Sequence, residues 1–203
     1  MADVPARGRV RVALVDSGVD PAHPGLRGKF VLGERDALRD RLGHGTWMAA
    51  AILALAPDAE LVAIAVLEDV DRCGPIELLR GIDAALALSP DFVNVSLGVI
   101  DLAQRDAFAA GIARALACGA RIVAPASLQG LPCWPGALDG ADGVVVDPNL
   151  ARALPQRRRV GDREFWFASP QAPSFGSLPA PRFRGESFAA ANVSGHLASR
   201  ARG

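Results

Sequence analysis

The sequence predicts an α/β domain with a mainly parallel β-sheet. Short apolar, β-branched runs alternate with longer helix-like runs along the chain, and turns that contain Gly or Pro separate them. Half of the 203 residues are apolar, which is enough for one substantial core. We therefore expect a single domain over residues 1–203, with the carboxyl ends of its strands along one edge of the sheet.

Strands are expected where an apolar run is short, rich in β-branched residues and followed by a polar or glycine-containing loop. These runs are residues 9–15, 29–32, 61–67, 91–98, 121–126, 143–146 and, at an edge of the sheet, 164–168. Pro125 predicts a bend or an unpaired position in its strand. The basic run 157–159 is interpreted as a solvated loop.

Helices are expected in four longer runs. Residues 44–56 are nearly all apolar and rich in alanine, so this helix should be buried. Residues 76–88 show apolar side chains at helical spacing after a proline, and residues 101–118 show a similar pattern that ends at a glycine. The last helix is expected from Ser187 to about residue 201.

Charge and composition exclude several partners. Lys plus Arg equals Asp plus Glu, at 22 each, so no overall basic field favours nucleic acid or an anionic membrane surface. No apolar run approaches the roughly 18 residues of a membrane span. The first residues, MADVPARGRV, lack the features of a signal peptide or a propeptide, so we expect a compact cytoplasmic protein.

The cysteines predict neither disulfides nor a metal site. Cys73, Cys118 and Cys133 are an odd number at wide spacings, which is typical of reduced thiols. They lack the spacing of zinc ligands, and no Asp-rich loop has the spacing of calcium ligands. We expect no metal and no cofactor.

Three short motifs carry the residue types of nucleophilic catalysis. Asp16 lies in VALVDSG, His44 in GHGT and Ser187 in GESFAAANVSG. A serine hydroxyl becomes a nucleophile when an imidazole takes its proton, and a carboxylate orients and stabilises that imidazole. Taken singly, each residue has a structural alternative: a turn-forming Asp, a loop His and a helix N-cap Ser.

The order of the motifs resembles a known family. VALVDSGVDPAHPGL, GHGT with its apolar continuation, PDAELVAIAVL, NVSLG and GESFAAANVSG follow one another as in the subtilisin-like serine proteases, the subtilases or peptidase S8 family. The resemblance covers about residues 9–198. It implies a three-layer sandwich with a mainly parallel sheet of about seven strands, and hydrolysis of peptide bonds through an acyl-enzyme.

The resemblance also implies a role for each matching residue. Asp16 is similar to the triad acid, His44 to the general base and Ser187 to the nucleophile, whose backbone amide donates to the oxyanion. Ser96, Leu97 and Gly98 resemble the segment that pairs with an extended substrate and forms one wall of the S1 pocket, the pocket for the side chain before the cleaved bond.

The sequence departs from the family around the expected oxyanion hole. The stretch VAPASLQG contains no Asn where the family has its oxyanion-hole asparagine. Leu128 aligns with that position, and its neighbours Ser127 and Gln129 can donate a hydrogen bond. Other positions at which the family usually has Thr, Pro and His carry different residues, namely Glu186, Ala191, Asn192 and Trp47. His23 and His196 lie outside any triad-like motif and are expected to be structural or surface residues.

Two functions therefore stay open. The first is a serine endopeptidase that uses Asp16, His44 and Ser187 to process a peptide or protein precursor in extended conformation. The second is a catalytically impaired subtilase that binds peptides or regulates another protein, because the oxyanion-hole asparagine is missing and the carboxylate of Glu186 lies beside the nucleophile. The sequence predicts neither the natural substrate nor the oligomeric state.

Overall fold

The computed structural model describes residues 8–67, 73–176, 178, 181 and 185–201. They form an eight-stranded sheet in the order β2-β3-β1-β4-β5-β8-β10-β9. Seven strands run parallel, and only β9 runs antiparallel to its neighbour β10. The bounds are Arg11–Asp16 (β1), Phe30–Gly33 (β2), Glu60–Ala65 (β3), Phe92–Val95 (β4), Arg121–Pro125 (β5), Asp142–Val146 (β8), Gln156–Val160 (β9) and Arg163–Ala168 (β10). The predicted α/β class is confirmed.

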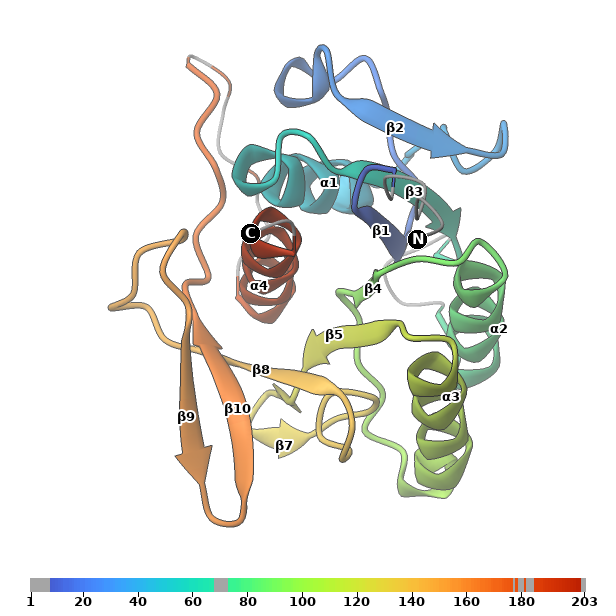
Figure 1. Cartoon of the computed structure of the whole chain (residues 1–203), viewed down its shortest axis with the longest axis vertical. Helices are drawn as coiled ribbons and strands as arrows, with labels where there is room; N and C mark the ends of the chain where they lie inside the picture. The colour runs from blue at the N-terminus through green and yellow to red at the C-terminus, as the bar shows by residue number, and fades with distance from the viewer. Residues whose placement is uncertain (1–7, 68–72, 177, 179–180, 182–184, 202–203) are drawn as a thin grey trace, which may run out of the picture.

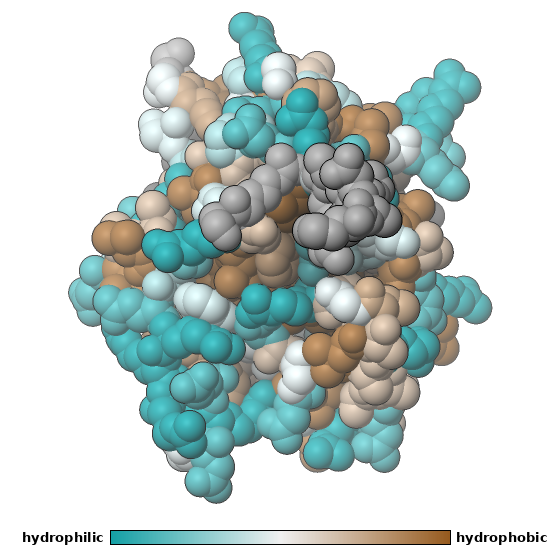
Figure 2. Space-filling model, in the orientation of Figure 1, coloured by the Kyte–Doolittle hydropathy of each residue, from teal (hydrophilic) through white to brown (hydrophobic). Residues whose placement is uncertain are grey.

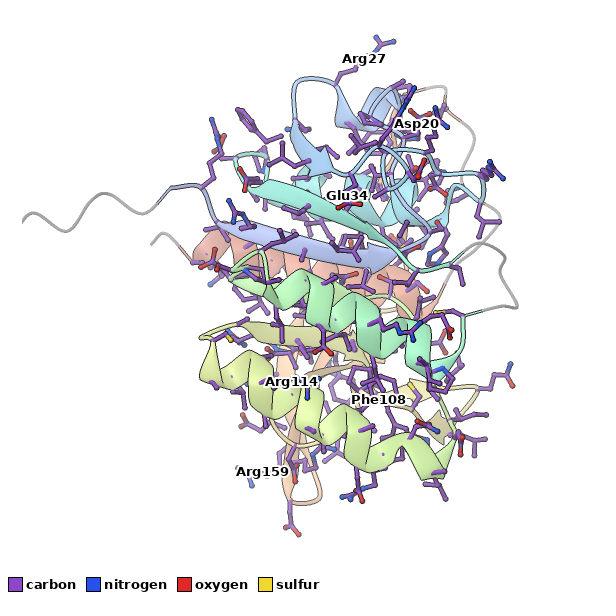
Figure 3. All side chains as sticks on the ribbon, turned by 90° about the vertical axis from the view of Figure 1, so that its right-hand side faces the viewer. Asp20, Arg27, Glu34, Phe108, Arg114 and Arg159 are labelled. Atoms are coloured by element: carbon purple, nitrogen blue, oxygen red, sulfur yellow. The ribbon has the colours of Figure 1, made fainter. Side chains whose placement is uncertain are left out.

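Helices cover both faces of the sheet and complete three layers (Figure 1). The helices α1 (His44–Leu55) and α4 (Glu186–Arg200) share one apolar core with the sheet, and α2 (Pro75–Leu86) and α3 (Arg105–Ala117) lie over a second core. Figure 3 shows α2 and α3 side by side, where Arg114 of α3 contacts Asp83 of α2 at 2.7 Å. Two short 3-10 helices, Pro24–Leu26 and Leu102–Gln104, complete the helical segments of the described chain.

The pair α1 and α4 is built from small side chains. Residues 48–53 of α1 and 188–193 of α4 are fully buried, and alanines occupy three positions in each stretch. A Cβ added at Gly195 would lie 2.7 Å from the carbonyl oxygen of Ile52, so α4 approaches the backbone of α1 closely. The expectation of a buried helix over 44–56 is thus confirmed, because no polar face is needed between two apolar layers.

The sheet edge near β9 differs from the expectation. Residues 157–159 belong to β9 and not to a loop, and β9 covers β10, which was expected at the edge. All residues of β9 are exposed, and Figure 2 shows a hydrophilic surface where Figure 1 places this hairpin. The strand is held by its ladder with β10 and by its arginines, because Arg158 lies 4.7 Å above the ring of Phe167 and 2.8 Å from Asp147.

A short hairpin follows β5. Its strands β6 (Ser127–Leu128) and β7 (Leu131–Pro132) pair antiparallel around Gln129 and Gly130, which have φ angles of 53° and 80°. Both turn residues have positive φ angles, as a two-residue hairpin turn of type I′ requires. In the part of the chain that the structure describes, no helix is both long and apolar enough to cross a membrane.

We predict opposite effects for two Gly-to-Ala changes inside helices. Gly195→Ala should lower the free energy of unfolding by about 1–3 kcal/mol, because the new methyl group meets a backbone oxygen of α1. Gly111→Ala in α3 has no neighbour nearer than 3.8 Å and should raise that free energy by up to about 1 kcal/mol. Urea denaturation of both variants measures the change in the free energy of unfolding. An equal change of the same sign in Gly195→Ala and Gly111→Ala would contradict the close packing of α1 on α4.

Candidate active site

The predicted catalytic residues come from two neighbouring strands and the two helices packed on them. Asp16 is the last residue of β1, and Ser96 follows β4, which pairs with β1 in the register Val15↔Val95. The helix α1 begins at His44, beside Asp16, and α4 begins one residue before Ser187, beside Ser96. The two helices therefore start at the same edge of the sheet, at adjacent strand ends.

Asp16 and His44 form a close pair. The Nδ1 atom of His44 lies 2.7 Å from Oδ1 of Asp16, which also accepts a hydrogen bond from the backbone N–H of Ser17 at 2.8 Å. Asp16 is fully buried, whereas the side chain of His44 is 17% exposed to solvent. Gly45 is required next to the pair, because a Cβ there would lie 3.1 Å from Oδ1 of Asp16 and overlap the carbonyl oxygen of Gly18.

The carboxylate of Asp16 favours the protonated form of the His44 imidazole. Burial favours the neutral ring, but the negative charge of Asp16, its hydrogen bond and the charge of Asp40 outweigh burial and raise the pKa of His44 above 6.5. With the Nδ1 proton held by Asp16, the neutral ring presents Nε2 as a proton acceptor. The pair therefore has the geometry of a base oriented by an acid.

Ser187 lies in the first turn of α4 with its hydroxyl directed at the strand end. Its Oγ donates to the carbonyl oxygen of Ser96 at 2.9 Å. The N-cap of α4 is Gly185, which has a φ of 105° and makes no side-chain cap. The interpretation of Ser187 as the helix N-cap is therefore wrong, and the left-handed glycine turn brings the serine to the rim.

Sequence reasoning missed a buried polar connection below this serine. The Oγ of Ser96 donates to Oδ1 of Asn94 at 2.7 Å, and Nδ2 of Asn94 donates to Oγ of Ser194 at 2.8 Å. All three residues are buried, so these hydrogen bonds attach α4 to the end of β4. The only signal in the sequence is an Asn and a Ser inside each of two otherwise apolar stretches, NVSLG and ANVSG.

Asp40 is a second residue that sequence reasoning missed. Its carboxylate accepts hydrogen bonds from the backbone N–H groups of Leu42, Gly43 and Thr46 and from the hydroxyls of Ser17 and Thr46. It thus fixes the loop before α1 and connects that loop to the residue after Asp16. An acidic residue shortly before a helix start is a capping signal that the sequence does contain.

The residues expected to form the oxyanion hole lie on the short hairpin after β5. Ser127 and Leu128 form β6 and are half-buried, whereas Gln129 is exposed in the turn. Among the described residues, no hydrogen bond joins the side chains of residues 127–130 to Ser187. Their assignment as donors stays a prediction.

Ser96, Leu97 and Gly98 follow the end of β4 directly and belong to no strand. Leu97 and Gly98 are half-buried, and within the described chain their backbone groups have no backbone hydrogen-bond partner. The segment ends at Val99, which exchanges backbone hydrogen bonds with Trp134 at 3.0 and 2.8 Å. A peptide strand could therefore pair with residues 96–98.

Two of the residues that depart from the family pattern, Trp47 and Asn192, have structural contacts. The Trp47 ring packs with those of His23 and Phe175 at 5.0 and 5.8 Å. The Asn192 amide donates to the carbonyls of Ser169 and Gln171, at 2.9 and 3.1 Å. The described chain contains no group of three or more His, Cys, Asp or Glu side chains that could hold a metal ion.

Comparison with known proteins identifies the family. The model of the subtilase family, peptidase S8, matches residues 8–126, which include Asp16, His44 and Ser96. The chain belongs to the subtilase family.

It is 37% identical over 102 residues to subtilisin E of Bacillus subtilis, a match that covers 44% of the chain and 27% of subtilisin E. The major intracellular serine protease of Bacillus subtilis is 32% identical over 108 residues, covering 44% and 34%. The chain thus spans about a quarter to a third of the length of these relatives.

Solved structures share the fold over nearly the whole length of this chain. The prenylagaramide maturation protease PagA has a TM-score of 0.75 at 21% identity, covering 95% of the chain and 75% of PagA. The nisin leader peptidase NisP from Lactococcus lactis has a TM-score of 0.66 at 17% identity, covering 95% and 77%. The fold likeness therefore covers much more of the chain than residues 8–126, the part matched by the family model.

We predict that the Asp16 carboxylate sustains the raised pKa of His44. Histidine titration by NMR should give a pKa above 6.5 for His44, and Asp16→Asn should lower it, because burial is then opposed less. The contribution of His44 to the free energy of unfolding is fully present below pH 6.5 and is lost as the pH rises through the raised pKa. His23 is the internal control: burial lowers its pKa below 6.5, and the variant should not change it. An unchanged His44 pKa in the variant would contradict the pairing.

We further predict that Asp40→Asn destabilises the start of α1. The side-chain amide of the new asparagine places an N–H donor where the carboxylate accepted hydrogen bonds from backbone N–H groups. The free energy of unfolding should therefore fall by about 1–3 kcal/mol. Asp36→Asn is the matched control, because Asp36 is exposed and its side chain makes no hydrogen bond in the described chain. Chemical denaturation of both variants measures the difference. Equal stabilities would show that Asp40 does not brace the loop.

Proposed function

We propose that this subtilase is a serine endopeptidase with the triad Asp16, His44 and Ser187, contained in a single catalytic domain over residues 1–203. The observation that carries the proposal is the buried carboxylate of Asp16, 2.7 Å from Nδ1 of His44, at the same sheet edge as the Ser187 hydroxyl. Burying a carboxylate completely costs free energy unless a partner interacts with its charge. Here that partner is the imidazole of His44, which is itself partly exposed to solvent.

The proposed reaction starts with a rotation of the Ser187 side chain. In the free protein its hydroxyl donates to Ser96, so it must turn from that carbonyl oxygen toward Nε2 of His44. Oγ then attacks the substrate carbonyl carbon while Nε2 takes the proton, and the imidazolium is stabilised by Asp16. The same proton passes to the leaving amine, and water, deprotonated by His44, hydrolyses the acyl-enzyme and restores the serine.

The substrate is proposed to be an extended peptide. Leu97 and Gly98 support this, because their backbone groups have no backbone hydrogen-bond partner among the described residues, and a peptide strand alongside them supplies hydrogen bonds without regard to its sequence. The narrower proposal is the processing of a peptide or protein precursor. It is supported by two of the structural neighbours, a prenylagaramide maturation protease and a nisin leader peptidase. We also propose a cytoplasmic location, in line with the intracellular serine proteases among the relatives.

The impaired, peptide-binding subtilase is the second candidate. It is favoured by the hairpin after β5, which offers no asparagine and no side-chain hydrogen bond to Ser187 in the described chain. The loss of one oxyanion donor costs on the order of 100- to 1,000-fold in turnover, a magnitude known from a subtilisin itself. A protein with such a loss would still bind peptides but would cleave them slowly.

We predict that Ser187 reacts with a fluorophosphonate probe and that the protein cleaves members of a broad peptide library. Ser187→Ala should abolish labelling and lower kcat at least about 1,000-fold, because the nucleophile is removed. Ser199→Ala is the matched control, since Ser199 is exposed on the same helix, and it should leave both readouts unchanged. Peptide binding without labelling or cleavage, and indifferent to Ser187→Ala, would refute the enzyme and support the binding module.

A further inference from the structure

The strand β9 carries three consecutive arginines at an edge of the sheet. Its sequence is QRRRV, all of its residues are exposed, and in the described part of the chain its neighbour in the sheet is β10. On the side away from that neighbour, an edge strand presents backbone N–H and C=O groups with which another extended chain can pair. Successive side chains of a strand alternate, so Arg158 lies on one face of the sheet and Arg157 and Arg159 lie on the other.

Aromatic rings of β10 hold two of these guanidinium groups in place. The Cζ atom of Arg157 lies 5.3 Å from the ring centroid of Trp166, its partner in the register, and that of Arg158 lies 4.7 Å from the ring centroid of Phe167. These cation-π contacts restrict side chains that otherwise sample many rotamers. A guanidinium that is already positioned loses less conformational entropy when a carboxylate binds it.

Two of the carboxylates that pair with these arginines lie below the surface. Asp142 is 3.9 Å from Arg157, and Asp147 is 2.8 Å from Arg158. The side chains of Asp142 and Asp147 are 7% and 14% exposed, whereas those of Arg157 and Arg158 are 53% and 40% exposed. An approaching chain therefore meets the cations before the anions beneath them.

Arg159 keeps its charge free for a partner. Among the described residues its side chain makes no hydrogen bond and no ion pair, although Glu164 lies opposite it in the register. The carboxylate of Glu164 lies 3.7 Å from Arg157 instead. In Figure 3 Arg159 is at the opposite end of the molecule from Arg27.

A strand with acidic residues at three consecutive positions matches this edge. In a paired strand, the residue opposite each arginine lies on the same face as that arginine, so three acidic side chains meet three guanidinium groups. Opposite charges across a ladder stabilise it, and the backbone of the added strand supplies the hydrogen bonds. A nucleic acid has no such backbone, and the chain as a whole carries no net positive charge that would attract it.

The position of β9 relates this edge to the proposed nucleophile. The sheet order β4-β5-β8-β10-β9 has four strand spacings between β4, whose end is beside Ser187, and β9, or about 19 Å at about 4.8 Å each. The strand begins at Gln156, which pairs with Phe167 near the end of β10, and so it begins at the same rim as Ser187. An extended chain covers that distance with about six residues.

We propose that the outer edge of β9 binds a segment of the substrate that contains three consecutive acidic residues, about six or more residues away from the cleaved bond. The segment pairs with β9 as an additional strand. The inference rests on the proposed function in one respect, because the segment is taken to belong to a substrate. The strand pairing itself does not depend on Ser187.

Binding of fluorescent peptides to the Ser187→Ala protein, which does not cleave them, tests the pairing. One peptide has three consecutive glutamates, and a second of equal composition has its glutamates separated by threonines. The first should bind at least about 3-fold more tightly, as measured by fluorescence anisotropy. Arg159→Gln should weaken its binding about 3-fold or more without changing the melting temperature. Arg27→Gln, at an exposed arginine at the other end of the molecule, is the matched control and should not weaken it.

The backbone part of the pairing has its own readout. The amide NMR signals of residues 156–160 should shift when the first peptide binds. N-methylation of the glutamate amides should weaken binding, because hydrogen bonds of the ladder are lost. Equal affinity for the two glutamate peptides, signal shifts confined to other residues, or tighter binding of a single-stranded DNA oligonucleotide would each overturn the inference.

Cleavage assays with the wild-type protein separate this inference from the proposed function. Joining the acidic run to a peptide substrate through a linker of about eight residues should lower KM about 3-fold or more and leave kcat unchanged. A linker of about two residues should give no gain, because it cannot span the distance. Turnover of the plain substrate without a gain from the long linker would contradict the inference. Absence of turnover with every substrate refutes the proposed function alone, because peptide binding still decides the strand pairing.

Discussion

A carboxylate withdrawn from water at the end of a central strand is the constraint on which the rest of the site depends. Asp16 is fully buried, and an unpaired charge in that position would cost several kcal/mol. Its Oδ1 is compensated by the imidazole of His44 and the backbone N–H of Ser17. These two partners in turn require the glycine at position 45 and the loop that Asp40 fixes. The acid, the base and the start of α1 are thus parts of one arrangement.

The second half of the site depends on how α4 sits against the sheet. The helix packs on α1 through alanines and Gly195, and it is attached to β4 through Asn94 and Ser194. The close apolar packing fixes its distance from the sheet, and the buried hydrogen bond fixes its position along its own axis. Ser187 therefore meets Ser96 as a consequence of contacts that lie two helical turns away from it.

The fold was largely predictable because its signals are local. The alanine-rich run 44–56 and the β-branched runs around Val15 and Val95 carry their periodicity and burial in their own composition. The position of Asp16 after a strand, and hence its edge of the sheet, followed from the same signals. The family resemblance supplied the grouping of Asp16, His44 and Ser187, which lie far apart in the chain.

What the sequence did not predict arises from contacts between distant segments. The strand β9 is almost entirely polar and exists because β10 pairs with it. The contacts of Asn94 with Ser194 and of Cys133 with Gly98 join residues 100 and 35 positions apart, so no local pattern reveals them. The oxyanion donor is the remaining gap, because a two-residue turn decides where Ser127 and Gln129 point.

The arginine-rich outer strand has a consequence for the behaviour of the protein at high concentration. Edge strands present unpaired backbone groups, which are templates for sheet-to-sheet aggregation. Here one edge, β9, carries three consecutive arginines, and at the other edge the guanidinium of Arg9 lies 3.4 Å above the exposed ring of Phe30 in β2. Two copies that approach edge to edge therefore bring cation against cation, and the repulsion opposes the addition of a ninth strand from another molecule.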